Sequence, residues 1–146
     1  MGIKNVLLEN RIPQNKFRNV IQPSVGEITF ISVGDLEEEL DFVDLPDRTS
    51  RTGGRTKQIE FEVVQPMHHD IEVAAMEAWY TECKDPVSPD HLKIWTYTRI
   101  DLGDNPRRVT VLDNCSVMKK VESESDLDND GDMATITWTI KADATI

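Results

Sequence analysis

The residues of this chain that could do chemistry fall in three places, and the first is an acidic segment, DLDNDGD. It begins like a calcium-binding loop, because Asp126, Asp128 and Asp130 are spaced as carboxylate ligands and Gly131 stands at the turn. An EF-hand loop needs a bidentate glutamate at its twelfth position, where this chain has Thr137. The segment therefore indicates an acidic turn between two strands.

The second place is a pair of histidines, His68 and His69, followed by the acidic residues Asp70 and Glu72. His68 and Glu72 are four residues apart, so a helix would place them on one face. A zinc site needs further ligands, and no ligand spacing connects the pair to His91, the third histidine of the sequence. The pattern favours solvated polar residues at the start of a helix, and we expect no metal and no cofactor.

The third place is a cysteine nucleophile, Cys83 or Cys115, with His91 as its base. Cys115 falls within an apolar strand pattern, where thiols are usually unreactive. Two cysteines give no disulfide framework and indicate buried thiols in a reducing compartment. The sequence also has no phosphate-binding glycine loop and no nucleophile-elbow motif, so it predicts a protein that is not an enzyme.

Length and charge narrow the class of protein. The chain has 146 residues, enough for one core, and we expect a single domain over 1–146. Its net charge of -11 argues against binding nucleic acid through the phosphates. The N-terminal residues lack the pattern of a secretory signal, and no apolar run reaches the length of a membrane-spanning helix. We expect a soluble protein with no membrane contact.

Apolar residues alternate with polar ones in several segments, a period that predicts β-strands with one buried face. The predicted strands are 27–33, 57–65, 92–99, 109–122 and 134–141. Helical spacing predicts one helix over 70–83, with Asp70 as its N-cap. The predicted fold class is mainly β with one α-helix: a small antiparallel β-sandwich or barrel-like domain that the helix covers.

Two of these elements have an apolar face that should form the core. On the helix, the predicted face is Ile71, Ala74, Ala75, Ala78 and Trp79. Trp79 should anchor the helix to the sheet, near Phe61, Val111 and Ile136. On the long strand, the predicted face is Val109, Val111, Cys115, Val117 and Val121.

Two regions have no clear period. Asparagines and prolines break residues 1–26 into an irregular N-terminal arm. Residues 34–56 form the second region, a long loop that is acidic first and then basic, with Arg48, Arg51 and Arg55. This separation of charge favours contacts between copies of the chain, with the loop disordered until assembly. Two alternatives are a mobile surface loop, and a short strand or helical turn in the acidic half.

From Gly26 to Lys141 the order of elements resembles a known family. The marks are a Leu-Pro pair at 45–46, a Gly-rich patch at 52–54, an Asp-initiated helix that ends near Trp79, and a segment DNCSVMKKVES before the last strand. These features resemble the tail tube proteins of contractile-tailed bacteriophages, which are related to type VI secretion tube proteins.

The resemblance implies rings of six subunits whose sheets join between neighbours, stacked into a tube that DNA passes through without specific binding. It implies tail sheath, baseplate or tail-tip and terminator proteins as partners. It also implies a place in the virion tail, after assembly in the bacterial host cytoplasm. The polar strand faces would then line the lumen, with candidate residues Glu60, Glu62, Glu122, Thr135, Thr137 and Thr139.

Three alternatives remain open from the sequence. The acidic residues could instead make an outer surface soluble. The chain could be a monomeric β-domain binding module that presents loop 34–56 to a protein partner. A calcium-binding extracellular domain would depend on DLDNDGD alone.

Overall fold

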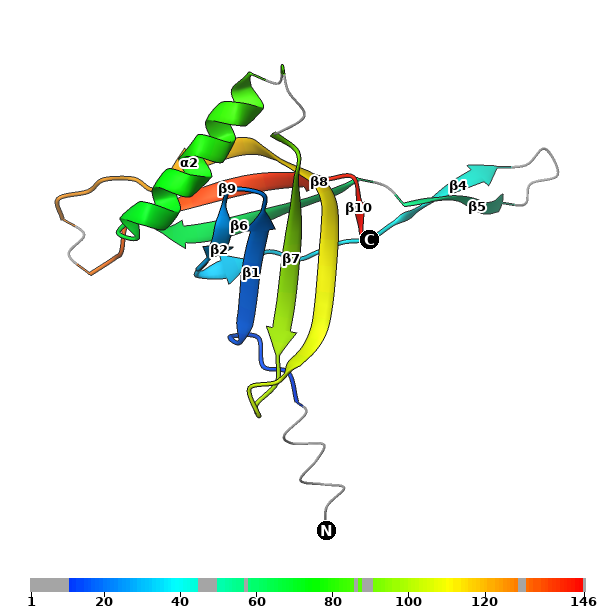
Figure 1. Cartoon of the computed structure of the whole chain (residues 1–146), viewed down its shortest axis with the longest axis horizontal. Helices are drawn as coiled ribbons and strands as arrows, with labels where there is room; N and C mark the ends of the chain where they lie inside the picture. The colour runs from blue at the N-terminus through cyan, green and yellow to red at the C-terminus, as the bar shows by residue number, and fades with distance from the viewer. Residues whose placement is uncertain are drawn as a thin grey trace, which may run out of the picture.

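The structure is a computed structural model, and it describes residues 11–44, 50–56, 58–85, 87, 91–128 and 131–145, with the backbone alone at 40–44, 50–56 and 144–145. Figure 1 shows its elements in space. In chain order they are β1 (Phe17–Gln22), β2 (Gly26–Ile28), β3 (Ser32–Val33), β4 (Leu40–Asp44), β5 (Ser50–Thr56), β6 (Ile59–Pro66), α2 (Asp70–Lys84), β7 (Lys93–Ile100), β8 (Pro106–Glu122), β9 (Thr135–Ala142) and β10 (Ala144–Thr145).

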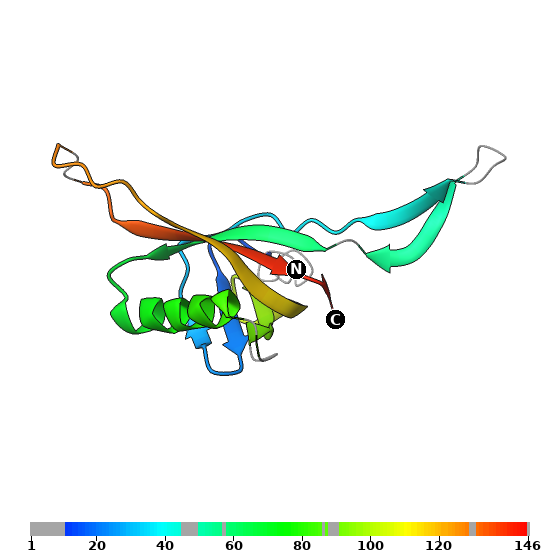
Figure 2. The ribbon, with the colours of Figure 1, turned by 90° about the horizontal axis from the view of Figure 1, so that it is seen from above.

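The main sheet folds about one long strand, β8. The strand order is β2-β1-β7-β8-β9-β6-β3, with β10 also on β8, and every pairing is antiparallel. β7 pairs with the first half of β8 and β9 with its second half. We call β2, β1, β7 and the first half of β8 sheet A, and the second half of β8, β9, β6 and β3 sheet B. The strands of the two sheets cross, and α2 covers one face of sheet B (Figures 1 and 2). The predicted fold class is confirmed.

Two irregularities in β8 change which of its residues face the core. The pairing with β7 shifts near Asn114, whose φ of 50° is left-handed, and the pairing with β9 shifts between Val117 and Lys119. An extra residue in one strand of a pair reverses the alternation that follows it. The prediction for this strand was therefore partly wrong: Leu112, Cys115 and Val117 are buried, whereas Val109 and Val121 are exposed.

Aromatic side chains fill the space between the sheets and the helix. The Trp95 ring stacks on Phe30 with 5.4 Å between centroids and meets the edge of Phe61 at 5.3 Å. Trp79 lies against the same ring at 6.1 Å. Trp138 is also fully buried, and its Nε1 donates a hydrogen bond to Gln65 Oε1 at 3.0 Å. The indole N–H groups that are buried here thus have acceptors, as burial requires.

The helix presents only part of the predicted face to the core, namely Ala75 and Trp79. Met76 and Trp79 are buried, whereas Ile71 is 88% exposed and Ala74 and Ala78 are also exposed. Burial of the larger side chains removes more apolar area from water, which favours this rotation of the helix. Asp70 is the first helical residue and not the N-cap, a position that His69 occupies without a side-chain cap bond.

The first strand of the chain lies where an irregular arm was predicted. Residues 17–22 form β1, which pairs with β7 along its whole length, and Ile21 is fully buried there. The predicted strand 27–33 is divided, because β2 pairs with β1 in sheet A and β3 pairs with β6 in sheet B. This segment therefore crosses from one sheet to the other and closes that side of the sandwich.

Residues 34–56 were predicted as a loop, and the structure instead has two strands within the described part of this range. The disorder expected for the single subunit stays a prediction. β4 and β5 form a two-stranded antiparallel hairpin, in agreement with the alternative of a strand in the acidic half. The hairpin extends away from the body of the molecule, opposite to the end where the segment between β8 and β9 projects (Figure 2). Cross-strand pairing of Phe42 with Thr52 and of Val43 with Arg51 satisfies backbone groups that a loop would leave to water.

Candidate functional site

The two cysteines are placed where thiols are unreactive. Cys115 is fully buried, and desolvation raises its pKa to about 12. Desolvation also raises the pKa of Cys83, whose Sγ accepts a hydrogen bond from Val117 N at 3.4 Å. Both groups remain protonated at neutral pH, and a thiol is a poor nucleophile in that form. His91 meets Cys83 through its backbone carbonyl, 3.9 Å from Sγ, which cannot act as a base.

The histidine pair forms a local contact at the start of α2. His69, and not His68, pairs with Glu72, with 3.1 Å between Nδ1 and Oε2. The same carboxylate oxygen accepts a bond from Thr29 N at 3.3 Å, which joins the helix to the segment after β2. No group of three potential metal ligands comes together in the described parts of the chain.

The acidic segment between β8 and β9 is a turn as far as the structure describes it. Asp126 Oδ1 accepts a hydrogen bond from Asp128 N at 3.0 Å, the usual short-range bond of an aspartate in a turn. Thr137, at the twelfth position of the calcium-loop pattern, is paired within β9. Asp130 lies outside the described residues. Across the described residues, none of the helices is long and apolar enough to span a membrane.

The surface that collects most of the candidate residues is the face of sheet B turned away from the helix. Cross-strand register places Glu62 opposite Thr139 and Glu60 opposite Lys141. Because side chains alternate along a strand, Thr137 and Thr135 share this face. Glu60 and Glu62 are exposed, whereas Thr139 is only 9% exposed between its neighbours. We call this surface the open face of sheet B.

Glu122 was predicted to share that face, and the register contradicts this. After the shift between Val117 and Lys119, Glu122 pairs with Ile136, whose side chain is buried on the helix side of the sheet. Lys120, two residues earlier and on the same side, lies 3.7 Å from Glu77 of α2 and 3.6 Å from Glu122. The irregularity at Met118 thus moves this carboxylate to the opposite face.

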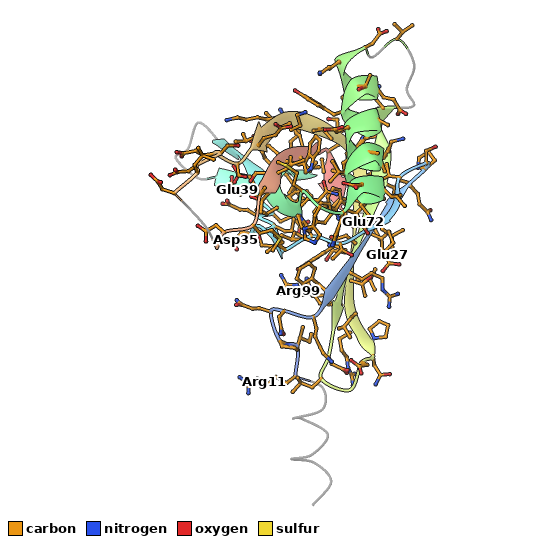
Figure 3. The ribbon with its side chains drawn as sticks, turned by 90° about the vertical axis from the view of Figure 1, so that its left-hand side faces the viewer. Arg11, Glu27, Asp35, Glu39, Glu72 and Arg99 are labelled. Atoms are coloured by element: carbon orange, nitrogen blue, oxygen red, sulfur yellow. The ribbon has the colours of Figure 1, made fainter. Side chains whose placement is uncertain are left out.

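The open face of sheet B also has a hollow that the sequence patterns do not predict. Its volume is about 390 Å³, and its lining includes Glu60 and Glu62 of β6 together with Glu37 and Glu39. The chain after β3 stays close to β6, since Gly34 N donates to Glu62 O at 2.7 Å. A Cβ at Gly34 would stand 3.0 Å from that oxygen, so only glycine fits without a shift. Figure 3 shows Glu39 and Asp35 on the side away from the helix.

Trp79 is the residue that the sequence predicts as the anchor of the helix. It is 1% exposed, and its Nε1 donates to His91 O at 2.8 Å, which ties α2 to the start of β7. Its ring neighbour is Trp95, which the prediction did not name. Val111, one of the predicted neighbours, is only half-buried because the irregularity near Asn114 gives the core position to Leu112.

The arginines of the hairpin are divided between described and undescribed residues. Arg51 and Arg55 lie on β5, where the backbone alone is described, and Arg48 lies outside the described residues. The hairpin strands carry charges of opposite sign, with Asp41 and Asp44 on β4.

Sheet A has backbone edges without a full complement of partners. β2 ends the strand order on one side and has three residues. On the other side, β10 pairs with β8 at Asp113 and Leu112 only. Residues 106–111 of β8 therefore have a strand on one side, within the described residues, and such an edge is a template for pairing with another chain.

Comparison with known proteins shows which fold this is. No protein-family model and no curated protein matches the sequence. The chain matches a solved structure of the sheath/tube terminator of PVC, an extracellular contractile injection system, with a TM-score of 0.75 and 16% identity over 95% of this chain and 97% of that one. It matches the sheath–tube complex of the same system with a TM-score of 0.70 and 15% identity over 98% and 95% of the two chains.

A third match is Hcp1 from Flavobacterium johnsoniae, with a TM-score of 0.51 and 16% identity over 90% of this chain and 98% of that one. The matches cover nearly the whole of each chain, so nearly all of this chain has the fold of tube-type proteins from contractile systems.

Proposed function

We propose that this chain is a structural subunit of a contractile tail tube, which forms six-membered rings that stack around a channel. The observation that carries the proposal is the fold: 98% of the chain superposes on 95% of a chain from a sheath–tube complex. An insertion or a missing element would have left part of one chain without a counterpart.

The open edges of sheet A support association between copies. An exposed edge strand invites pairing with another chain. Here the edge strand of β8 includes residues 106–111, and β2 on the other side is short. Two different edges on one subunit allow a head-to-tail contact that closes into a ring.

In this proposal the open face of sheet B lines the channel. Its exposed carboxylates, Glu60 and Glu62, and the threonines of β9 make a polar wall. Such a wall repels the phosphates of DNA within a Debye length of about 8 Å at physiological salt, which lets the duplex slide without binding. The apolar face of the same strands forms the core, so the wall and the fold use the two faces of one sheet.

The hairpin of β4 and β5 would extend to the next ring, where Arg48, Arg51 and Arg55 meet acidic residues. Its length beyond the body of the molecule supports this role (Figure 2). The partners in the assembled device would be tail sheath, baseplate or tail-tip and terminator proteins. The tube would be assembled in the cytoplasm of a bacterial host and act in the virion tail, with DNA passing through it.

Negative-stain images of the purified protein, together with size-exclusion chromatography over a range of concentrations, test the proposal. We expect rings or tubes, formed alone or on an added baseplate nucleus. A monomer under all these conditions would contradict the proposal and favour the monomeric binding module that presents residues 34–56.

A further inference from the structure

Two arginines face each other at the far end of sheet A. In the antiparallel register of β7 and β8, Arg99 lies directly opposite Arg108, and both side chains are exposed. The Arg99 guanidinium is held over the Tyr97 ring, 5.4 Å from its centroid. Like charges directly opposite each other across a strand pair disfavour the pairing. An anion close to both guanidinium groups would offset their repulsion.

Two of the carboxylates near this arginine pair already have cationic partners. Lys16 pairs with Asp104, and Arg18 lies 3.6 Å from Glu27. Two carboxylates, Glu27 and Asp35, line the cleft that Arg99 borders. In the described residues, no ion pair involves Arg99 or Arg108.

Arg107, the neighbour of Arg108, is bound at 2.6 Å to the buried carboxylate of Asp101. Figure 3 shows Arg99 and Arg11 below Glu27 and Glu72, toward the same end of the molecule. This end therefore has an excess of positive charge in a chain whose net charge is -11.

An acidic stretch without a basic residue lies between β8 and β9. Between Lys120 and Lys141 the sequence has no lysine or arginine, and its acids are Glu122, Glu124, Asp126, Asp128, Asp130 and Asp132. The described members of this set are exposed, and the intervening Leu127 is fully exposed. By contrast, residues 40–56 of the hairpin contain Asp41, Asp44 and Asp47 against its three arginines, so their charges balance.

We propose that Arg99 and Arg108 are the docking site for the acidic segment 122–132 of a second copy of this chain. Arg108 lies near the start of β8 and the segment follows the end of the same strand, so the segment of one copy is far along the strand from its own arginines. The contact is heterologous, the kind that generates rings or filaments. Opposite charges on the two surfaces fix the register of the partners and speed their encounter, and salt weakens both effects. The inference rests on the proposed function, since it requires self-association.

Charge reversal with rescue tests this pairing. We expect Arg99→Glu with Arg108→Glu to raise the concentration needed for half-assembly by about tenfold or more. Glu124→Lys with Asp128→Lys should have a similar effect and leaves Asp126 in place to accept its turn bond. The variant with all four changes should assemble within about threefold of the wild type, because the salt bridges re-form with opposite polarity.

The matched control is Arg51→Glu with Arg55→Glu on the hairpin. It is tested alone and together with Glu124→Lys and Asp128→Lys, the two changes that we call the reversed segment. Circular dichroism and thermal melting establish that each variant folds. If the Glu pair at 99 and 108 prevents folding, Arg99→Gln with Arg108→Gln replaces it and should reduce the salt dependence of assembly.

Three results would overturn the inference. In the first, the wild type assembles and reversal or neutralisation at 99 and 108 changes nothing. In the second, the reversed segment rescues the hairpin variant instead of the Arg99 and Arg108 variant. In the third, the wild type stays monomeric under all conditions, which would also overturn the proposed function.

Discussion

Trp95 and Asn19 are joined by a hydrogen bond in the middle of the core, with 2.9 Å between the indole Nε1 and the amide Oδ1. Trp95 is fully buried and Asn19 is 1% exposed. The bond fastens β1, near the start of the chain, to β7, which follows the helix. A polar side chain in a segment that the sequence left irregular thus completes the environment of the central tryptophan.

Removal of the amide should destabilise the protein. We expect Asn19→Ala to lower the free energy of unfolding by about 1–3 kcal/mol, because it leaves a buried indole N–H without an acceptor. Urea unfolding followed by tryptophan fluorescence measures the change. Asn15→Ala, at an exposed position, is the control and should have no effect beyond error. Equal stability of the two variants would show that the bond contributes nothing.

Trp79 carries two separable contributions, packing and a hydrogen bond. Trp79→Ala should cost roughly 3–5 kcal/mol, because it leaves a cavity beside Trp95. Trp79→Phe keeps much of the packing but loses the bond to His91 O, and we expect a loss nearer to about 1 kcal/mol. Thermal melts of both variants separate the two effects. A melting temperature that neither change lowers would contradict the anchoring role.

The role of the charge on the open face of sheet B can be tested by measuring how fast DNA passes through the tube. Glu60→Lys with Glu62→Lys should leave tubes intact but slow the passage of DNA, most strongly at low salt, because the new cations hold the phosphates. Asp70→Lys with Asp85→Lys makes the same change of charge on exposed residues at the two ends of α2 and should not slow passage. Single-particle ejection assays on intact tails give the rates. Unchanged rates in the first variant would place this face outside the channel.

Ring stacking should depend on the hairpin. Arg51→Glu with Arg55→Glu should shorten tubes without changing the fold of the single subunit, because β4 and β5 extend beyond its body. Tube lengths in negative stain, at low and high salt, measure the effect. Tubes of wild-type length at every salt concentration would show that these arginines make no contact between rings.

Asp101 should make stability depend on pH in the acid range. Its pKa is lowered from 3.8, first by the hydrogen bond from Arg107 and then by the one from Asn105 N. A lowered pKa in the folded state means that the stabilisation is complete above the unfolded value of 3.8 and is lost as the pH falls through the folded value. The melting temperature of the wild type should therefore fall more steeply below about pH 4 than that of Asp101→Asn. Asp85→Asn, at an exposed position, should follow the wild type.

The sequence predicted the elements whose pattern is regular. β6 alternates from Ile59 to Val63 and β9 from Thr135 to Ile140, and their predicted core residues, such as Phe61 and Ile140, are buried. The same alternation placed Glu60, Glu62 and the threonines of β9 on one face, as the register does. The two-residue period of a strand is sufficient to predict which side chains share a face here, because neither strand contains a bulge.

The sequence did not predict the features that depend on distant partners. A bulge is a mismatch between two strands, so the alternation of β8 alone could not show that Glu122 leaves the face of Glu60. β1 depends on β7 for its pairing, and its own residues have no clear period. The hollow near Glu37 depends on the close approach of the chain at Gly34 to β6, which no spacing along the sequence reveals.

The shared strand β8 also determines the order in which the chain can find its native state. Its two partners, β7 and β9, are its neighbours in sequence, so a three-stranded meander forms by closing short loops. β1 pairs with β7, although α2 and several strands lie between them in the sequence. β6 and β9 are separated by a similar number of residues. Contacts between distant residues carry a larger loop-closure entropy, so local pairs form first. We therefore expect β7, β8 and β9 to make up the folding nucleus, onto which the N-terminal half condenses later.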